Sequence, residues 1–170
     1  ALDVESMYET STKVFILEVM GRHAGWIAGS SCLAQDSHPG APHIILLPEI
    51  SFNQKKFLAK VKETVKKNGF CVIVASEGIK NSQGKFLAES DSKDAFGHSQ
   101  LGGVAPRLAD LINQKLKLKN HWAVADYLQR SASHLSSGVD RAHAYEVGRK
   151  AVLYATQGLN GVMPVIKRKS

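Results

Sequence analysis

The sequence predicts an α/β fold with a doubly wound, mostly parallel sheet flanked by helices. Two observations carry this prediction: several near-continuous apolar runs rich in Val and Ile, and a segment of helical periodicity between two of them. Apolar runs that do not alternate with polar residues are typical of parallel strands, whose two faces are both covered by helices. Crossovers between parallel strands are almost always right-handed, so the β-α-β-α-β order of the first part of the chain makes a doubly wound sheet the expected architecture.

The individual elements follow from the same patterns along the chain. Each expected strand is bounded by Gly, Pro, Asn or Ser. The strands are expected at residues 14–19, 43–47, 70–75 and 161–166, and the helices at residues 26–33, 51–68, 104–119, 122–136 and 140–156.

The helix expected over residues 51–68 has the clearest periodicity. Its apolar residues recur at helical spacing, Ser51 can cap its start, and the pair Asn68-Gly69 can end it. The helix expected over residues 104–119 also carries an apolar face, and it tolerates Pro106 in its first turn.

Composition places the chain among ordinary globular domains. It has 170 residues, of which 44% are apolar and 22% charged, enough for one hydrophobic core and one domain. Lysine and arginine total 22 against 15 acidic residues, and this net charge of +7 favours an anionic partner. The basic residues are dispersed among acids and aromatics make up only 7%, which disfavours a nucleic-acid binder.

Cysteine usage and hydropathy indicate the compartment. Cys32 and Cys71 show neither a pairing pattern nor metal-ligand spacing, and both are expected to pack as small hydrophobic residues. No apolar stretch approaches the roughly 20 residues that span a bilayer, and no charged-then-apolar leader opens the chain. We therefore expect a cytoplasmic protein with no membrane partner.

The junction after the first expected strand carries the strongest functional signal. The run of residues 14–19 ends in Met20-Gly21-Arg22 and continues into a helix-compatible segment from Trp26. In open α/β sheets, ligands bind at the carboxyl ends of the strands. A helix start offers backbone N–H groups and the Arg22 guanidinium offers a planar set of donors, so a phosphate or carboxylate is the expected ligand. An ordinary glycine turn with a solvated Arg22 is the alternative.

Two other loops place polar side chains where a ligand could lie. Glu77 directly follows the strand at residues 70–75, so its carboxylate should lie over the same edge as Arg22 and could accept hydrogen bonds from sugar hydroxyls. The stretch at residues 96–103 surrounds His98 with three glycines, which permit a close backbone approach to a ligand. A surface glutamate and a plain helix-entry turn are the respective alternatives.

A further cluster lies in the helix expected over residues 122–136. Tyr127, Arg130 and His134 are spaced by three and four residues, so they should share one helix face and could hold a phosphate. A solvated helix face is the alternative.

Other catalytic patterns are absent from the sequence. It contains no Gly-x-x-x-x-Gly-Lys-Ser/Thr phosphate loop, no Gly-x-Gly-x-x-Gly and no Gly-x-Ser-x-Gly. The histidines and cysteines show no metal-ligand spacing, so no metal site is expected on this chain.

Four motifs together resemble the phosphofructokinase family, and their order and spacing fit the family across nearly all of the chain. They are Met20-Gly21-Arg22-His23-Ala24-Gly25-Trp26, Ser76-Glu77-Gly78, Gly97-His98-Ser99-Gln100-Leu101-Gly102-Gly103 and Ala125-Asp126-Tyr127-Leu128-Gln129-Arg130. The first and last motifs are most similar to the pyrophosphate-dependent branch of the family.

The resemblance implies a glycolytic phosphotransferase that makes fructose 1,6-bisphosphate from fructose 6-phosphate, with pyrophosphate as the donor and Mg²⁺ bridging it. Met20, Gly21 and Arg22 match the loop that holds the sugar phosphate, and Arg22 is also placed to stabilise charge on the transferring group. Glu77 matches the carboxylate that holds sugar hydroxyls. Further substrate contacts are implied at Tyr127 and Arg130, which match the pair that grips the 6-phosphate, at His98, and at Lys13, which falls where relatives carry an arginine that reaches a neighbouring subunit.

The resemblance also implies that part of the enzyme lies outside this chain. The family's glycine-rich donor loop and its Thr-Ile-Asp-Asn-Asp segment, which supplies the general base, have no counterpart here, and Leu101 replaces an arginine of the ATP-dependent bacterial branch. We therefore expect residues 1–170 to be a single α/β unit, the C-terminal, fructose 6-phosphate-binding half of a two-domain enzyme that forms homo-oligomers.

This half should be inactive alone, because positioning and charge stabilisation cannot be combined without the base and the donor site. Mg²⁺ should be bound mainly through the donor and the absent half. The alternatives are a non-catalytic domain that binds a sugar phosphate or polyanion, and a fragment of an ATP-dependent 6-phosphofructokinase.

Overall fold

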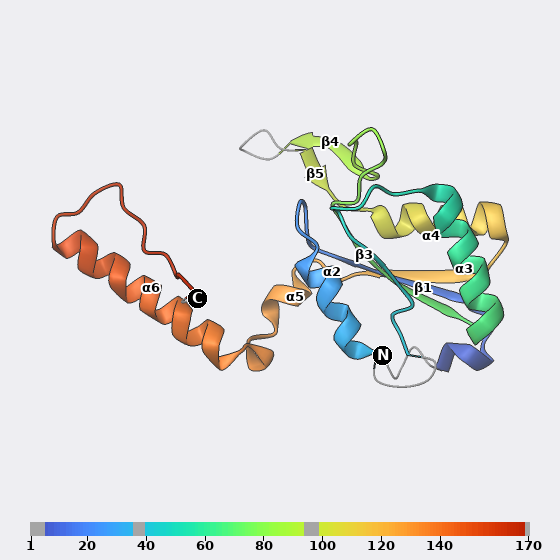
Figure 1. The fold of residues 1–170 in the computed structure, drawn as a ribbon, viewed down its shortest axis with the longest axis horizontal. Helices are drawn as coiled ribbons and strands as arrows, with labels where there is room; N and C mark the ends of the chain where they lie inside the picture. Colours follow the sequence, from blue (N-terminus) through green and yellow to red (C-terminus); the bar gives the residue numbers. More distant parts are fainter. Residues whose placement is uncertain (1–5, 36–39, 94–98, 169–170) are drawn as a thin grey trace. The chain divides into compact units, whose positions relative to one another are not determined.

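The computed structural model describes residues 6–35, 40–93 and 99–168 (Figure 1). The chain forms two compact units, residues 1–129 and residues 130–170. The strands lie in the first unit, and the second unit is helical.

A four-stranded parallel sheet forms the centre of the first unit. Its strands are β1 (Val14–Val19), β2 (Ile44–Leu46), β3 (Cys71–Ser76) and β6 (Asn120–Val124), in the order β2-β3-β1-β6. In register, Val14 lies opposite Cys71 of β3 and Asn120 of β6. The strands predicted at residues 14–19, 43–47 and 70–75 are confirmed to within one residue at each end, and so is their parallel arrangement.

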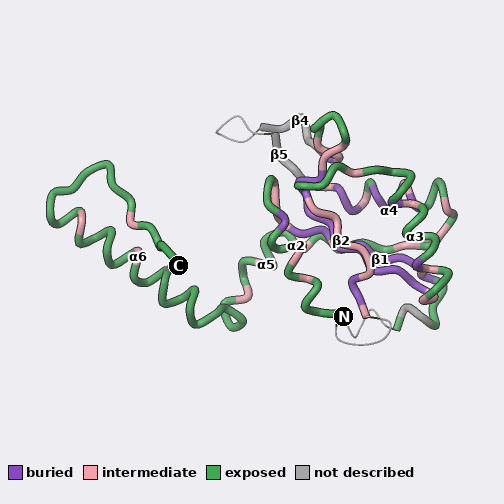
Figure 2. Tube along the Cα trace, in the orientation of Figure 1, coloured by how far each residue is buried: buried purple, intermediate pink, exposed green. Residues whose placement is uncertain are grey.

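Helices cover both faces of this sheet. On one face, α3 (Gln54–Asn68) and α4 (Val104–Leu116) pack against Ile16 and Ile73. On the other face, α2 (Trp26–Ser30), continued by the 3-10 helix η2 (Ser31–Ala34), packs with Val19 and Val74. Every residue of β3 is buried, and Figure 2 shows the burial concentrated in the sheet. The predicted fold class, a parallel sheet flanked by helices, is confirmed.

α3 begins three residues later than Ser51, and the prediction of Ser51 as its cap is wrong. Asn53 caps the helix instead, because its side chain accepts the N–H of Lys56 at 3.0 Å. The residues before Asn53 stay outside the helix and bring Phe52 against Phe57, with ring centroids 5.2 Å apart. The predicted end is confirmed, since Gly69 adopts the left-handed conformation with φ 83°.

Residues 120–124 form β6, where the sequence predicts the start of a helix. α4 ends at Leu116 rather than at residue 119 because Lys117 turns into the left-handed region (φ 57°) and donates its N–H to Asn113. The chain then pairs in parallel with β1. The helix predicted over residues 122–136 is therefore wrong in its first part, since pairing with a distant strand outweighs local propensity.

The chain after β6 forms short helices and one long one. α5 (Leu128–Ser131) and the 3-10 helix η3 (Ser133–Leu135) precede α6 (Gly138–Thr156), which confirms the helix predicted over residues 140–156. Ser137 caps α6 by accepting the N–H groups of Val139 and Asp140. No residue of α6 is buried, as Figure 2 shows.

The strand predicted at residues 161–166 is wrong. Residues 162–168 have no regular secondary structure, and Met163 is 78% exposed. An apolar run becomes a strand only where a neighbouring strand supplies hydrogen-bond partners. Within the described part of the chain, no strand pairs with these residues, and β6 occupies the fourth place in the sheet.

Three short elements complete the description. β4 (Glu89–Lys93) and β5 (Ser99–Leu101) form an antiparallel pair that the sequence does not predict, and the 3-10 helix η1 (Ser6–Glu9) precedes β1. Among the described residues, no helix is long and apolar enough to cross a membrane.

The two cysteines are both free thiols, but they differ in burial. Cys71 is buried, as expected, and burial raises the pKa of its thiol to about 12. Cys32 is exposed in η2, so the expectation that it packs as a small hydrophobic residue is wrong.

Candidate functional site

The loops that leave β1, β3 and β6 meet at one edge of the sheet, because the carboxyl ends of parallel strands point the same way. The β1 loop carries Met20, Gly21 and Arg22, and the β3 loop carries Glu77. Arg22 and Glu77 therefore lie at the same edge, where the sequence predicts them.

The β1 and β3 loops are joined backbone to backbone. The Gly21 carbonyl accepts the Gly78 N–H at 3.1 Å and also accepts the Ser76 hydroxyl. A Cβ atom at Gly78 would clash with the carbonyl groups of Gly21 and Arg22, so only glycine fits this approach. The position of the Arg22 backbone is thus set by the loop that follows β3.

Glu77 ties the same two loops together through its side chain. Its Oε1 accepts the Gly21 N–H at 3.1 Å, and its own N–H donates to Val19 at 3.0 Å. Both Glu77 and Arg22 are half-buried. The Glu77 carboxylate is therefore oriented by the loop that carries Arg22, and its second oxygen can accept a hydrogen bond from a ligand.

Gln129, in the segment that follows β6, contacts the loop after β1 at this edge. Its Oε1 accepts the Met20 N–H at 3.4 Å, while its Nε2 is buried and has no hydrogen-bond partner among the described residues. Buried amide groups are nearly always satisfied, so the unpaired Gln129 Nε2 is an exception at this edge. Sequence reasoning did not single out Gln129, although it lies between the predicted residues Tyr127 and Arg130.

Glu18, the next-to-last residue of β1, is a buried carboxylate near this edge, and sequence reasoning missed it. It is 2% exposed in β1, and its two oxygens accept the N–H groups of Gly103 at 3.0 Å and Ala105 at 2.8 Å. These bonds supply the cap that Gly103, which has no side chain, cannot give to α4. Burial raises the pKa of Glu18, the two N–H donors oppose that rise, and the nearby charge of Glu77 adds to it. A lone acidic residue inside an apolar strand was the available signal.

The start of α2, which follows Arg22, is held by two further contacts. The Gly25 N–H donates to Oε1 of Glu49, in the loop after β2, at 2.8 Å. Nζ of Lys80 lies 3.3 Å from Nδ1 of His23. The loops after β2 and β3 thus both fix the segment that carries Arg22.

Lys13 lies at the opposite end of β1 from Arg22. It precedes the first residue of the strand, and its N–H donates to Lys119 at 2.9 Å. The structure therefore separates Lys13 from the edge that carries Arg22 and Glu77.

The predicted shared helix face of Tyr127, Arg130 and His134 is wrong. Tyr127 lies in the turn before α5 and is 69% exposed, Arg130 lies in α5, and His134 lies in η3. The helix is broken because β6 extends to Val124 and α5 ends at Ser131. Arg130 belongs to the second unit. His98 lies outside the described residues.

The described residues contain no group of three or more His, Cys, Asp or Glu side chains that could hold a metal ion. What they assemble at the edge is an arginine, a carboxylate and an unsatisfied amide donor. An arginine can bind an anionic group, and a carboxylate can accept hydrogen bonds from hydroxyl groups.

Comparison with known proteins identifies the family. The sequence model of the phosphofructokinase family matches residues 3–155, and the chain belongs to this family. A pyrophosphate–fructose 6-phosphate 1-phosphotransferase of Halomonas elongata is 58% identical over 170 residues, and one of Xanthomonas campestris is 56% identical over 171. Each match covers 100% of this chain and 41% of the relative, so the chain spans about two fifths of the length of these relatives.

A solved structure shares the fold. The crystal structure of pyrophosphate-dependent phosphofructokinase from Marinobacter aquaeolei matches with a TM-score of 0.77 and 50% sequence identity. The match covers 99% of this chain and 38% of that chain.

Proposed function

We propose that this chain supplies the fructose 6-phosphate site of a pyrophosphate-dependent phosphofructokinase. The proposal is supported by the names of the relatives and by one structural observation. That observation is the hydrogen bond between the Gly21 N–H and Glu77, which joins an arginine loop to a carboxylate at the sheet edge. An arginine and a carboxylate held in fixed relation suit a substrate that carries both a phosphoryl group and hydroxyls.

Each side chain has a chemical role in this proposal. Arg22 binds the phosphoryl group and offsets its negative charge during transfer. Glu77 accepts hydrogen bonds from sugar hydroxyls through the oxygen that Gly21 leaves available. The 6-phosphate is held by Tyr127 and Arg130, with His98 as a further contact to the sugar.

The reaction of the whole enzyme is a transfer between oxygens. The 1-hydroxyl oxygen of fructose 6-phosphate forms a bond to a phosphorus of pyrophosphate, the bond to the bridging oxygen breaks, and orthophosphate leaves. The proton of the 1-hydroxyl passes to a general base, which the family resemblance places outside this chain. We therefore predict no turnover by the 170 residues alone, which a coupled assay for fructose 1,6-bisphosphate measures directly.

Mg²⁺ enters the proposal only through the donor. We assign its binding to pyrophosphate and to the rest of the enzyme, because Mg²⁺ is usually held by substrate phosphates together with one or two carboxylates. No step performed by this chain's residues depends on the metal ion.

The place of Lys13 supports a role in a homo-oligomer. It lies at the amino end of β1, away from the edge that carries Arg22. We assign it to the substrate phosphate of a neighbouring subunit, for which a lysine supplies charge without the paired donors of an arginine.

Calorimetric titration of the chain tests the proposal. We expect fructose 6-phosphate to bind more tightly than inorganic phosphate, and Arg22→Gln and Arg130→Ala each to weaken its binding about tenfold, because each removes a charge-assisted hydrogen bond. Lys115→Gln, which removes an exposed charge from α4, is the matched control and should leave the affinity unchanged. Equal affinities for fructose 6-phosphate and phosphate, or affinities that depend only on salt, would contradict it.

A second candidate is a non-catalytic domain that binds a sugar phosphate or polyanion, and the net charge of +7 favours it. Both candidates predict binding by the isolated chain. Assay of the complete gene product with pyrophosphate and with ATP separates them, and it also identifies the donor. Formation of fructose 1,6-bisphosphate from either donor excludes the non-catalytic candidate.

A further inference from the structure

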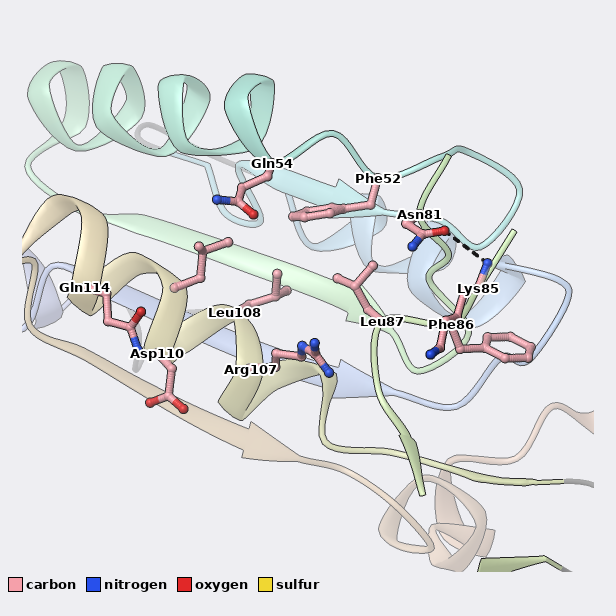
Figure 3. Close-up of a pocket in the computed structure, with 11 residues that line it drawn as sticks. Phe52, Gln54, Asn81, Lys85, Phe86, Leu87, Arg107, Leu108, Asp110 and Gln114 are labelled. Atoms are coloured by element: carbon pink, nitrogen blue, oxygen red, sulfur yellow. Dashed lines mark hydrogen bonds between the residues drawn. The ribbon is translucent and has the colours of Figure 1, made fainter. Parts of the chain in front are cut away.

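A cavity of about 650 Å³ opens on the α3 and α4 side of the sheet (Figure 3). Its walls are the start of α3, the loop at residues 81–87 and residues 107–114 of α4. Its lining includes none of the site residues proposed above. The volume falls within the range typical of small-molecule sites, about 300–1,000 Å³.

The lining has an apolar floor and a polar rim. Phe52, Leu87 and Leu108 supply the floor, and Figure 3 shows these three side chains grouped between the two helices. Gln54 and Arg107 stand on opposite sides of them in the same view. An apolar floor that includes the Phe52 ring, below charged groups, favours a ligand with an aromatic ring and one strongly polar end.

The charges of the rim favour an anion. Lys85 and Arg107 are both exposed cations of the lining, and within residues 6–35, 40–93 and 99–168 neither forms an ion pair. Asp110 lies three residues after Arg107 on α4, but Figure 3 shows the two side chains diverging. The Arg107 guanidinium can therefore offer paired donors to a phosphate.

The loop wall of the cavity is held in place before any ligand arrives. Asn81 Oδ1 accepts the N–H groups of Gln83 at 2.9 Å and Lys85 at 3.0 Å, and the Asn81 N–H donates to Lys85 at 2.9 Å. The Phe52 N–H donates to the carbonyl of Lys80, one residue before this loop, at 2.7 Å, which fixes the floor beside the loop. A site that is ordered in advance loses less entropy on binding.

We propose that this cavity binds a small phosphorylated compound with an aromatic or heteroaromatic ring, up to the size of a nucleoside monophosphate. The ring lies against Phe52 and Leu87, and the phosphate meets Arg107 and Lys85. This site is separate from the fructose 6-phosphate site and does not depend on that assignment, because the two share no residue.

Phenyl phosphate is the probe that tests the site, since it carries only the two groups that the cavity recognises. Titration of the ¹⁵N-labelled 170-residue chain should show saturable shifts at Leu87, Arg107 and Leu108. Phenol and inorganic phosphate should each bind at least tenfold more weakly, because each lacks one of the two groups.

Variants separate a built site from general charge attraction. Arg107→Gln should weaken phenyl phosphate about tenfold and Lys85→Gln by a smaller factor, while Lys115→Gln, on the same helix but outside the lining, should have no effect. Excess fructose 6-phosphate should not displace the probe. Absence of saturable binding, equal binding to Arg107→Gln and the unmodified chain, or displacement by fructose 6-phosphate would overturn the proposal, whatever the fate of the fructose 6-phosphate site.

Discussion

Two regions of the chain that the sequence marks as functional behave differently in the structure. The loop from Met20 to Arg22 is interlocked with the loop after β3 through Gly21, Glu77 and Gly78. The segment around Tyr127 and Arg130 instead forms a turn and one short helix with no buried residue. The difference shows that backbone pairing between two loops fixes the first region, whereas the second region lacks such pairing and is joined to the edge through the Gln129 side chain.

The largest effect is expected from a substitution at Gly78, where the loops after β1 and β3 contact each other. Gly78→Ala places a methyl group against the carbonyls of Gly21 and Arg22, so it should lower the free energy of unfolding of the first unit by about 3 kcal/mol. Urea titration followed by the amide resonances of β1 and β3 measures this loss.

Gly29→Ala is the matched control, because a Cβ there meets no atom within 4 Å and the residue lies inside α2. It should leave stability unchanged or raise it by up to about 1 kcal/mol. Equal effects of the two substitutions would show that the close approach at Gly78 does not hold the loops together.

The next largest loss of stability is expected from substitution of Glu18, the buried carboxylate of β1. Glu18→Gln keeps one acceptor but turns an NH₂ group toward a backbone N–H of Gly103 or Ala105, so it should cost about 1–2 kcal/mol of unfolding free energy. The loss should be seen first as faster amide exchange at the start of α4.

Glu18 also predicts a pH dependence with a definite sign. Its pKa is raised in the folded state, so the folded chain holds this proton more tightly, and stability from this group declines as the pH rises above the ordinary value of 4.5. The stability difference between the unmodified chain and Glu18→Gln should therefore shrink with rising pH until the buried carboxyl is ionised. A stability difference that widens with rising pH would contradict the conclusion that burial raises the pKa of Glu18.

The same contrast explains what the sequence could predict. Residues 14–19 and 70–75 are so continuously apolar that burial on both faces was the natural interpretation, and it placed Arg22 and Glu77 at one edge. The run at residues 161–166 looks equally apolar but has no strand to pair with among those described, while Asn120–Val124 pairs with β1 despite its polar residues. Gln129 and Glu18 were missed because their hydrogen bonds join residues far apart in the chain.

Smaller changes in stability are expected from substitutions of the helix caps in the two units. Asn53→Ala should lower the unfolding free energy of the first unit by about 1 kcal/mol, because Lys56 loses its cap, while Ser51→Ala should change nothing. Ser137→Ala should reduce the helicity of α6 and leave the resonances of β1 and β3 unchanged. If Asn53→Ala and Ser137→Ala lowered the stability measured at β1 equally, the two units would unfold together, which would contradict this prediction.

The most direct measurement of the central claim is a titration of the ¹⁵N-labelled chain with fructose 6-phosphate. If the two loops form one binding edge, the amide signals of Gly21 and Gly78 shift together and saturate at the same ligand concentration, and Glu77→Gln weakens both responses. The amide of Gly69, which ends α3 at the opposite end of the sheet, stays in place. Shifts confined to other parts of the chain, or signals of Gly21 and Gly78 that saturate at different concentrations, would contradict the claim.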